Sequence, residues 1–432
     1  MPYQHERAGY RGLHHFGEQT HTSAAWRYWH PADQLANAIP PALACIPSDW
    51  QPRSIVAIDG SMVPVPLPSN PLIHLGAWTV SAITLDWMQI DHLNYQRPID
   101  PVVLRSCMQS TTLSGVLPSG LLEDANGQPA PVMLREYIFQ LLSNTYLPDA
   151  HESLLTTYAT LYHHRFPRTQ RFQRCPWWQI GCSHRVTHIT TGPCPCADQR
   201  AFYQTDALRL HERYTRVGIT MTVWNETMRV LEHLWFVHYV RAFVAKEAWN
   251  DLATTVFMLD GPLAIFGSAG WLSRAIRHEL RAIHRQLEQH QYAGGLLVLG
   301  IEKTGAFIEY FAALDHQHPI ANGTVIAVDD SLITQYSRHR RSQQQYGRNT
   351  YYGTKYFYKT ATGQRIVFTL AHTARHQQTS PPTRLADALA VIEQTRSVQY
   401  PHALIPIVLA HSETALPRTM TDQVMRTSGL LY

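Results

Sequence analysis

Two apolar segments, far apart in the sequence, both end in the pair Asp-Gly. Residues 54–61 read SIVAIDGS, and residues 254–263 read TTVFMLDGPL. A continuous apolar run bounded by a turn signal predicts a buried strand. The pattern therefore predicts two buried strands, with Asp59 and Asp260 where each strand leaves the core and Gly60 as the residue that lets the backbone turn.

These two carboxylates can meet if the two strands are neighbours in one sheet. A carboxylate at the end of a buried strand is fixed in direction and partly dehydrated, which suits it to bind a divalent cation. A pair of them is typical of a two-metal phosphodiester site. The alternative is a strand followed by a polar turn, because Asp-Gly is a common turn pair. Asp86, at the end of a strand predicted over 74–86, is either a third acid or an ordinary strand-end residue.

The remaining pattern divides the chain into an N-terminal arm, residues 1–50, and one domain, residues 51–432, interrupted by an insertion over 95–215. We expect a short helix over 31–38 and a proline-rich connection over 62–70. Apolar spacing predicts helices over 132–147, 222–249, 271–289 and 386–396, the second with Asn225 as its N-cap. Strands are predicted over 294–301 and 322–328, with a hairpin made of 356–360 and 365–370.

Composition limits the class of protein. The 432 residues are 45% hydrophobic, which is enough for a sizeable core, and the net charge of +4 permits nucleic acid as a partner without requiring it. The first residues, MPYQHERAGYRG, contain no apolar signal-like core, and we find no run of about 18 apolar residues. We therefore expect no membrane span and a cytoplasmic location.

The order strand–Asp, strand, helix, strand–Asp, helix, strand fits an α/β fold, a ribonuclease H-like mixed sheet flanked by helices. Such a site needs a further carboxylate, which the helix over 222–249 can supply. Glu232 is the preferred candidate, because it follows a run of core-facing positions, and Glu226 in the first turn is the alternative. Glu232 can also be read as a solvated helix residue.

The chain resembles the NurA family of DNA-end-processing nucleases. The resemblance lies in the segments 58–61 and 259–263, in Lys303, and in Tyr400 and His411 near the C-terminus. It implies a metal-dependent deoxyribonuclease, a 5′–3′ exonuclease and/or endonuclease using Mn²⁺ or Mg²⁺. It also implies a homodimer working with a HerA-type hexameric ATPase in DNA end resection or anti-phage defence. The implied catalytic residues are Asp59, Glu232, Asp260, Lys303, Tyr400 and His411, of which Asp59, Glu232 and Asp260 bind the metal.

A basic stretch over 336–359 interleaves cations with tyrosines. Cations bind phosphates and tyrosines offer stacking faces, so this stretch is a candidate DNA-binding element. The candidate residues are Arg338, Arg340, Arg341, Arg348 and Lys355. The alternative is a solvated hairpin with an exposed basic loop.

Four of the six cysteines fall close together, at Cys175, Cys182, Cys194 and Cys196. Four thiolates match the ligand set of a structural zinc site, and such a zinc ion would stabilise the fold of the insertion. His184 or His188 can replace one cysteine. A disulfide pair or buried thiols remain the alternatives, and Cys45 and Cys107 are expected to be buried small apolar residues.

Two other functions fit the same pattern. One is a non-catalytic module that binds DNA or an ATPase, and a third carboxylate reaching Asp59 and Asp260 would argue against it. The other is a different ribonuclease H-like enzyme, such as a transposase, with a late acid at Glu393 or Glu413.

Overall fold

The computed structural model describes residues 42–67, 69–92, 100–165, 173–178, 181–186, 189–194, 200–214, 220–292, 294–328, 350–371, 382, 384–397 and 402–416. Residues 1–41 form a unit of their own and lie outside the described residues, as does the helix expected over 31–38. Residues 42–50, which the prediction places in the N-terminal arm, belong to the second unit. Its first strand, β1 (Ala42–Leu43), pairs with β11.

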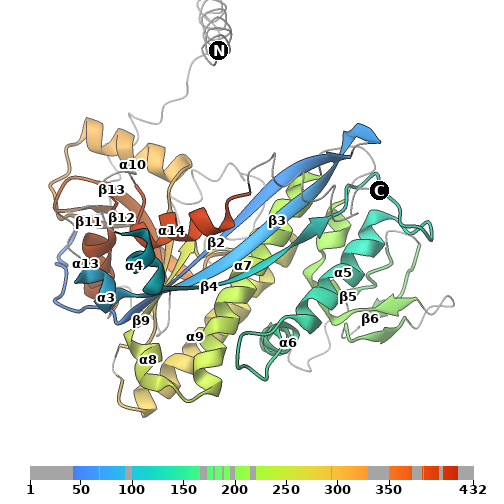
Figure 1. Ribbon diagram of the computed structural model, residues 1–432, viewed down its shortest axis with the longest axis horizontal. Coiled ribbons are helices and arrows are strands. Elements are labelled where there is room, and N and C mark those ends of the chain that lie inside the picture. The colour runs from blue at the N-terminus through green and yellow to red at the C-terminus, as the bar shows by residue number, and fades with distance from the viewer. Residues whose placement is uncertain are drawn as a thin grey trace, which may run out of the picture. The chain divides into compact units, whose positions relative to one another are not determined.

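The second unit is built on a nine-stranded mixed sheet (Figure 1). Its order is β1-β11-β12-β13-β10-β9-β2-β3-β4. The bounds are β2 (Ser54–Leu67), β3 (Asn70–Asp86), β4 (Met108–Leu117), β9 (Thr255–Asp260), β10 (Leu297–Glu302), β11 (Val325–Val328), β12 (Gly353–Lys359) and β13 (Arg365–Ala371). β2, β3 and β4 form an antiparallel meander, and β9 and β10 continue the sheet parallel to β2.

Five of these strands, in the order β4-β3-β2-β9-β10, give the ribonuclease H-like arrangement that the sequence predicts. The long helix α7 (Met221–Ala245) precedes β9, and α9 (Trp271–Gln289) connects β9 to β10. β4 lies inside the range expected as an insertion, yet it pairs with β3 over ten positions. The insertion expected over 95–215 therefore begins too early, because its first part completes the meander.

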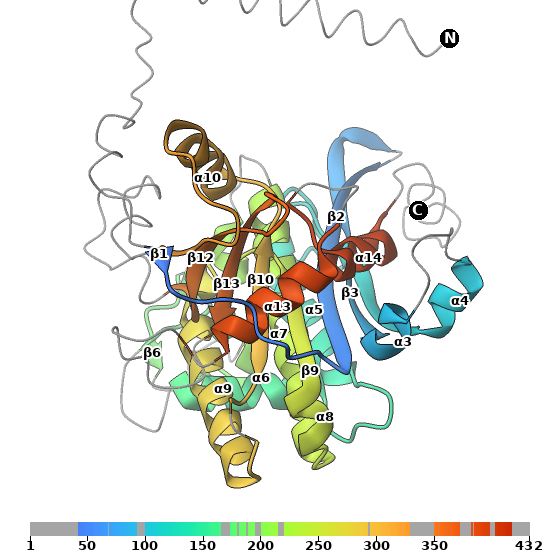
Figure 2. The ribbon, with the colours of Figure 1, turned by 90° about the vertical axis from the view of Figure 1, so that its left-hand side faces the viewer.

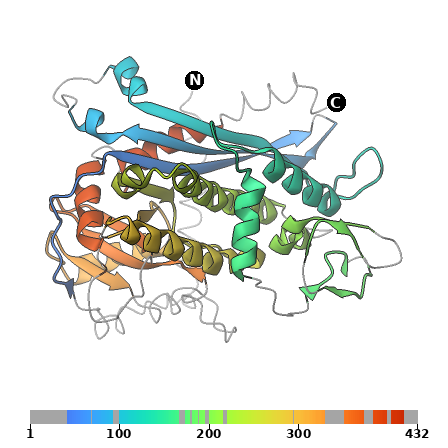
Figure 3. The ribbon, with the colours of Figure 1, turned by 90° about the horizontal axis from the view of Figure 1, so that it is seen from below.

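Helices cover both faces of the sheet. On one face α7 and α9 pack with α5 (Ala130–Asn144) and α6 (Leu154–Arg165), as seen from below in Figure 3. On the other face α13 (Leu385–Thr395) and α14 (Ile405–Thr414) cross the strands, as Figure 2 shows. Strand alternation separates the two cores, because Val56 and Ile58 belong to the α7 side whereas Ile55 and Ala57 belong to the α14 side.

The remaining elements are short. They are α3 (Trp87–Asp91), α4 (Pro101–Ser106), α8 (Trp249–Thr254) and α10 (Ala306–Gln317), with the 3₁₀ turns η2 (Gln204–Leu208), η3 (Leu210–Arg213) and η4 (Gly267–Ala269). Two small sheets, made of β5 (Gln173–Arg174) with β6 (Arg185–Val186) and β7 (Gly192–Pro193) with β8 (Ala201–Phe202), form what we call the cysteine lobe. Among the helices that the structure describes, none is long and apolar enough to cross a membrane.

Two sequence-based predictions of local structure are wrong. α7 begins at Met221 with Thr220 at its N-cap position, so Asn225 lies inside the helix. β2 does not end near Asp59 but runs on to Leu67, so most of the expected connection over 62–70 is strand. The prolines of β2 lie beyond Ile58, the last residue that pairs with β9. On that side, this part of β2 has no described strand partner, so a missing backbone N–H is tolerated.

Candidate active site

Asp59 and Asp260 lie side by side where β9 ends. The strands are parallel and in register, with Ile58 opposite Leu259, so the next residue on each strand is an aspartate. Both aspartates follow the alternation to the α14 face. Asp59 is 1% exposed, and burial, together with the nearby Asp260 carboxylate, raises the pKa of Asp59 to about 6. The two acids therefore share one partly dehydrated site.

Glu232 reaches this site from the opposite face of the sheet. Its carboxylate passes over Gly60, where an added Cβ would lie 2.5 Å from Glu232 Oε1. Burial raises the pKa of Glu232 to about 8, the nearby Arg229 guanidinium lowers it, and Asp59 and Asp260 raise it further. Gly60 thus permits close approach of a third carboxylate, and the expectation that it turns the chain is wrong.

The competing helix residue, Glu226, is engaged elsewhere. Its Oε1 lies 3.0 Å from Arg213 Nη2, and its carboxylate packs over Gly267, where an added Cβ would lie 2.7 Å away. Glu232 is therefore the residue of α7 that joins the two aspartates.

Two basic side chains, those of Lys303 and Arg229, contact the acids of the site. Lys303 follows β10, and its Nζ lies 3.2 Å from Asp260 Oδ2. Arg229 donates from Nη1 to the Asp260 carbonyl at 3.0 Å, and its Nε lies 3.6 Å from Glu232 Oε2. Sequence reasoning missed Arg229, although its position three residues before Glu232 on the same helix was the available signal.

His411 completes the described cluster. It lies in the last turn of α14, and its Nδ1 is 2.8 Å from Asp59 Oδ2. The Thr79 hydroxyl donates to the Thr414 carbonyl at 2.8 Å, which fixes the end of α14 on β3. The His411 side chain is 60% exposed, so one edge of the imidazole faces solvent. Tyr400 lies outside the described residues.

Three other acids are excluded from the cluster by their positions. Asp86 pairs in register with Ser54, where β2 begins, and caps α3 through a hydrogen bond from Gln89 N at 3.2 Å. Glu393 accepts a hydrogen bond from the Tyr358 hydroxyl at 2.7 Å, on the β12 side of the sheet. Glu413 is an exposed residue of α14.

The structure corrects the expected role of Lys355. This lysine is 1% exposed on β12, is ion-paired with Glu302, and has its Nζ 3.8 Å from the centre of the Phe307 ring. A buried, paired ammonium cannot contact a DNA backbone, because the alternation of β12 turns it into the core. Arg338, Arg340, Arg341 and Arg348 lie outside the described residues.

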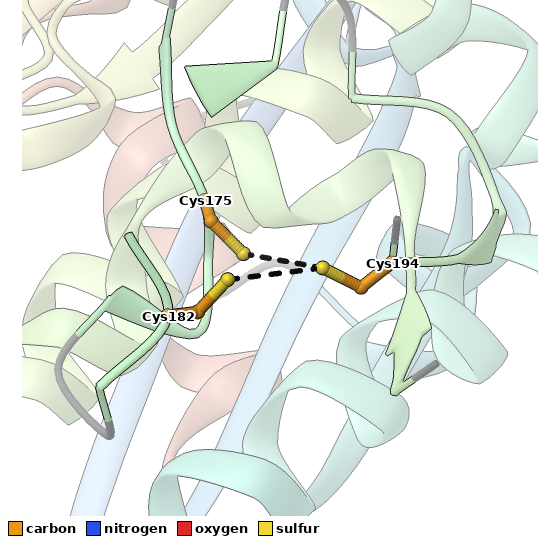
Figure 4. A group of neighbouring side chains, drawn as sticks. All are labelled: Cys175, Cys182 and Cys194. Atoms are coloured by element: carbon orange, nitrogen blue, oxygen red, sulfur yellow. Dashed lines mark hydrogen bonds between the residues drawn. The ribbon is translucent and has the colours of Figure 1, made fainter. Parts of the chain in front are cut away.

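Three cysteines of the cysteine lobe converge, as Figure 4 shows. The Sγ atom of Cys194 lies 3.7 Å from that of Cys175 and 3.9 Å from that of Cys182. These distances exceed a disulfide bond of about 2.05 Å. They match the edge of about 3.8 Å that Zn–S bonds of about 2.3 Å give in a tetrahedron.

No described residue joins the three cysteines as a fourth ligand within 4.8 Å of all of them. His184 Nδ1 lies 3.8 Å from Cys182 Sγ, whereas Cys196 and His188 lie outside the described residues. The three cysteines that converge can hold a metal ion. Of the other two cysteines, Cys107 is buried as expected and Cys45 is only half-buried.

The three acids of the site have the chemistry of divalent-cation ligands. Among the described residues, however, only the three cysteines bring their ligand atoms all within 4.8 Å of one another. Asp260 raises the pKa of Asp59, and both aspartates raise the pKa of Glu232, so a cation bound among the three acids would relieve this repulsion. Oxygen ligands of this kind suit Mg²⁺ or Mn²⁺. The arrangement can therefore hold a cation beside a lysine and a histidine, which are groups that bind and protonate a phosphate ester.

Comparison with known proteins gives loose structural likenesses. No family model and no curated protein matches the sequence. Among solved structures, a crystal structure of NurA matches over 99% of this chain and 97% of that chain, with a TM-score of 0.31 and 10% identity. A crystal structure of NurA with manganese matches over 98% of each chain, with a TM-score of 0.32 and 9% identity.

A third likeness is to Endonuclease V of Ciona intestinalis, in complex with a 23mer DNA containing an inosine. It covers 88% of this chain and 92% of that chain, with a TM-score of 0.25 and 11% identity. The candidate site is identified by the residues of this chain and not by these likenesses.

Proposed function

We propose that this protein is a metal-dependent deoxyribonuclease that hydrolyses phosphodiester bonds at the Asp59 site. The observation that carries the proposal is the convergence of Asp59, Asp260 and Glu232, from two strands and a helix, beside Lys303 and His411. A binding module has no need of three neighbouring carboxylates, since they repel a nucleic acid backbone unless a cation lies between.

Asp59, Asp260 and Glu232 would hold the cation. When bound, it supplies positive charge to the scissile phosphate and lowers the pKa of a water molecule. Lys303, already 3.2 Å from Asp260, is placed to neutralise charge on the phosphate.

His411 is suited to move the proton. Its Nδ1 is held by Asp59, so Nε2 is the nitrogen left to exchange a proton. Hydrolysis takes one proton from the attacking water and gives one to the leaving sugar oxygen. A histidine that accepts or donates at Nε2 serves either half of that exchange.

The finer features of the proposal come from the resemblance to NurA nucleases. We propose Mn²⁺ or Mg²⁺ as the cation, 5′–3′ exonuclease and/or endonuclease activity, a homodimer, and a HerA-type hexameric ATPase as partner in the cytoplasm. DNA end resection and anti-phage defence are the two processes in which such a pair would act.

We further propose that the metal of the cysteine lobe is zinc. Support comes from the thiol ligands and from the separations of 3.7 Å and 3.9 Å between their sulfur atoms. Three cysteines with a fourth protein ligand leave no open position, so this zinc would be structural.

The deciding experiment is cleavage of end-labelled linear DNA, single- and double-stranded, with Mn²⁺, Mg²⁺ or no divalent cation. We expect metal-dependent degradation by the wild type and a loss of at least about a hundredfold in Asp59→Asn. If no cleavage occurs under any condition, including after a HerA-type ATPase is added, the protein is the binding module instead.

Two glutamates on the same helix provide a matched pair. Glu232→Gln should abolish cleavage, because it removes a ligand, whereas Glu226→Gln should stay within about twofold of the wild type. Equal effects of the two substitutions would contradict the proposed role of Glu232 as a metal ligand.

A further inference from the structure

The cysteine lobe contacts the helices α5 and α6 through its inner side. The indole of Trp177 donates to the Ala201 carbonyl at 3.1 Å, and its ring lies 3.9 Å from the Arg135 guanidinium of α5. The Ile189 amide donates to the Tyr162 hydroxyl of α6 at 2.9 Å. The lobe therefore lies beside α5 and α6, away from the nine-stranded sheet (Figures 1 and 3).

The outer side of the lobe carries an open hollow of about 340 Å³, lined by residues 181–185 together with Arg174 and Trp178. This volume is within the range of small-ligand sites, about 300–1,000 Å³. The described residues that line it include two arginines and a histidine and no carboxylate. Trp178 is 38% exposed, with the Arg174 guanidinium 5.0 Å from its ring.

The two arginines of the hollow lie directly opposite each other. Arg174 on β5 and Arg185 on β6 are cross-strand partners, and both side chains are exposed. Like charges directly opposite on a strand pair destabilise it, and β5 and β6 share only two pairs of residues that could offset the repulsion. An anion bound between the two guanidinium groups removes the repulsion, so the pair points to an anionic ligand.

We propose that this hollow is a nucleotide subsite for single-stranded DNA. One unpaired base stacks on Trp178, and the adjoining phosphate binds between Arg174 and Arg185. An aromatic face inside a cationic groove is the combination that binds unpaired strands. An acidic peptide would use the arginines but not the ring face, and duplex DNA offers no unpaired base. The inference deepens the proposed function and rests on it for DNA as the polymer.

The test measures binding apart from cleavage. The full-length Asp59→Asn protein, without added divalent cation, is titrated into labelled oligothymidylate, into an abasic strand of the same length, and into a blunt duplex. Fluorescence anisotropy gives each Kd over a range of salt. The variants are Trp178→Ala, Trp178→Phe and the double change of Arg174 and Arg185 to Ala, with Arg105→Ala as a matched control. Arg105 is an exposed arginine of α4. The helix α4 and the strands β5 and β6 lie on opposite sides of Figure 1.

Trp178→Ala should weaken binding of oligothymidylate about tenfold and leave binding of the abasic strand unchanged, because only stacking is removed. Trp178→Phe should recover most of that affinity. The double arginine variant should weaken binding of both strands and lower the salt slope by about 0.7 for each phosphate that is no longer neutralised. Zinc content is measured for every variant, so that an unfolded lobe is recognised.

Two results overturn the subsite. One is a Trp178→Ala variant that binds oligothymidylate as tightly as the Arg105→Ala control. The other is displacement of the DNA by polyglutamate that depends on the arginines while Trp178→Ala has no effect, which would identify an acidic peptide as the ligand.

The two proposals fail separately. A wild-type protein that binds as described but never cleaves DNA would support the subsite and contradict the proposed nuclease activity. If the wild type cleaves DNA and Trp178→Ala binds oligothymidylate like the control, the nuclease activity is supported and the subsite is contradicted.

Discussion

Asp59 and Glu232 are two acids that ionise at higher pH than exposed carboxyl groups do. The pKa of Asp59 is raised to about 6 and that of Glu232 to about 8, chiefly by burial, so ionising either of them destabilises the fold. A raised folded-state pKa gives stability that is full below the unfolded pKa, about 4, and is lost as pH rises through the folded value. A bound cation favours the ionised forms and opposes this loss.

We therefore predict a pH-dependent difference between the wild type and Glu232→Gln. Without added divalent cation, the wild type should lose stability relative to Glu232→Gln between about pH 4.5 and pH 8, by on the order of a few kcal/mol. Urea unfolding at several pH values measures it, and added Mn²⁺ should shrink the difference. Parallel stability curves would show that Glu232 is not held in a buried acidic site.

Gly60 provides a second prediction, because its missing side chain makes room for Glu232. In Gly60→Ala the new Cβ would lie 2.5 Å from Glu232 Oε1 and 3.0 Å from Met228 Cγ, so the carboxylate must move. We expect cleavage to fall by about tenfold or more, since small displacements of a catalytic group are costly.

A double-mutant comparison checks the cause. If displacement of Glu232 explains the lower activity, Gly60→Ala should cost little more when it is added to Glu232→Gln. Fully additive effects would mean that the alanine acts through the strand instead.

At the scale of elements, α14 supplies the histidine of the site, whereas β2 and β9 supply its two aspartates. His411 and Glu413 lie two residues apart on this helix, and only His411 has a described hydrogen bond to Asp59. We predict that His411→Asn lowers kcat by about a hundredfold or more with unchanged Kd for DNA, as removal of a general acid–base group does. Glu413→Gln should leave kcat within about twofold. The opposite ranking would support a late acid on α14 in place of the histidine.

The elements also show where sequence reasoning succeeds and where it stops. The helix α9 covers the predicted residues 271–289, because five apolar residues repeat on one face with no competing signal. The end of β2 was misplaced, because Asp-Gly and the prolines after it are local turn signals. The long pairing with β3, which overrides them, is not visible in the local sequence.

At the scale of the whole molecule, Asp59 and Asp260 were predictable because parallel neighbouring strands bring matching positions together. Glu232 followed only from the need for a third ligand, and its approach over Gly60 depends on the packing of α7 across the sheet. Arg229 and the burial of Lys355 were missed, because both depend on which face of an element meets the core.

The cysteine lobe gives a prediction for the molecule as a whole. Purified protein should contain one zinc per chain, and Cys194→Ser should lose it, whereas Cys45→Ser should retain it. The lobe lies outside the nine-stranded sheet, so its unfolding should leave the main sheet intact. Limited proteolysis should then cut the cysteine lobe first and spare residues 220–292. Equal zinc content in the two variants would contradict the proposal that Cys194 is a zinc ligand.

The partner of Asp59 on α14 follows it by 352 residues. During translation the residues that carry the three carboxylates are made before the histidine. A nascent or prematurely terminated chain would thus bind cations yet lack its proton carrier. If the proposed function holds, the chain gains its full cleavage activity only after residue 411 has been added.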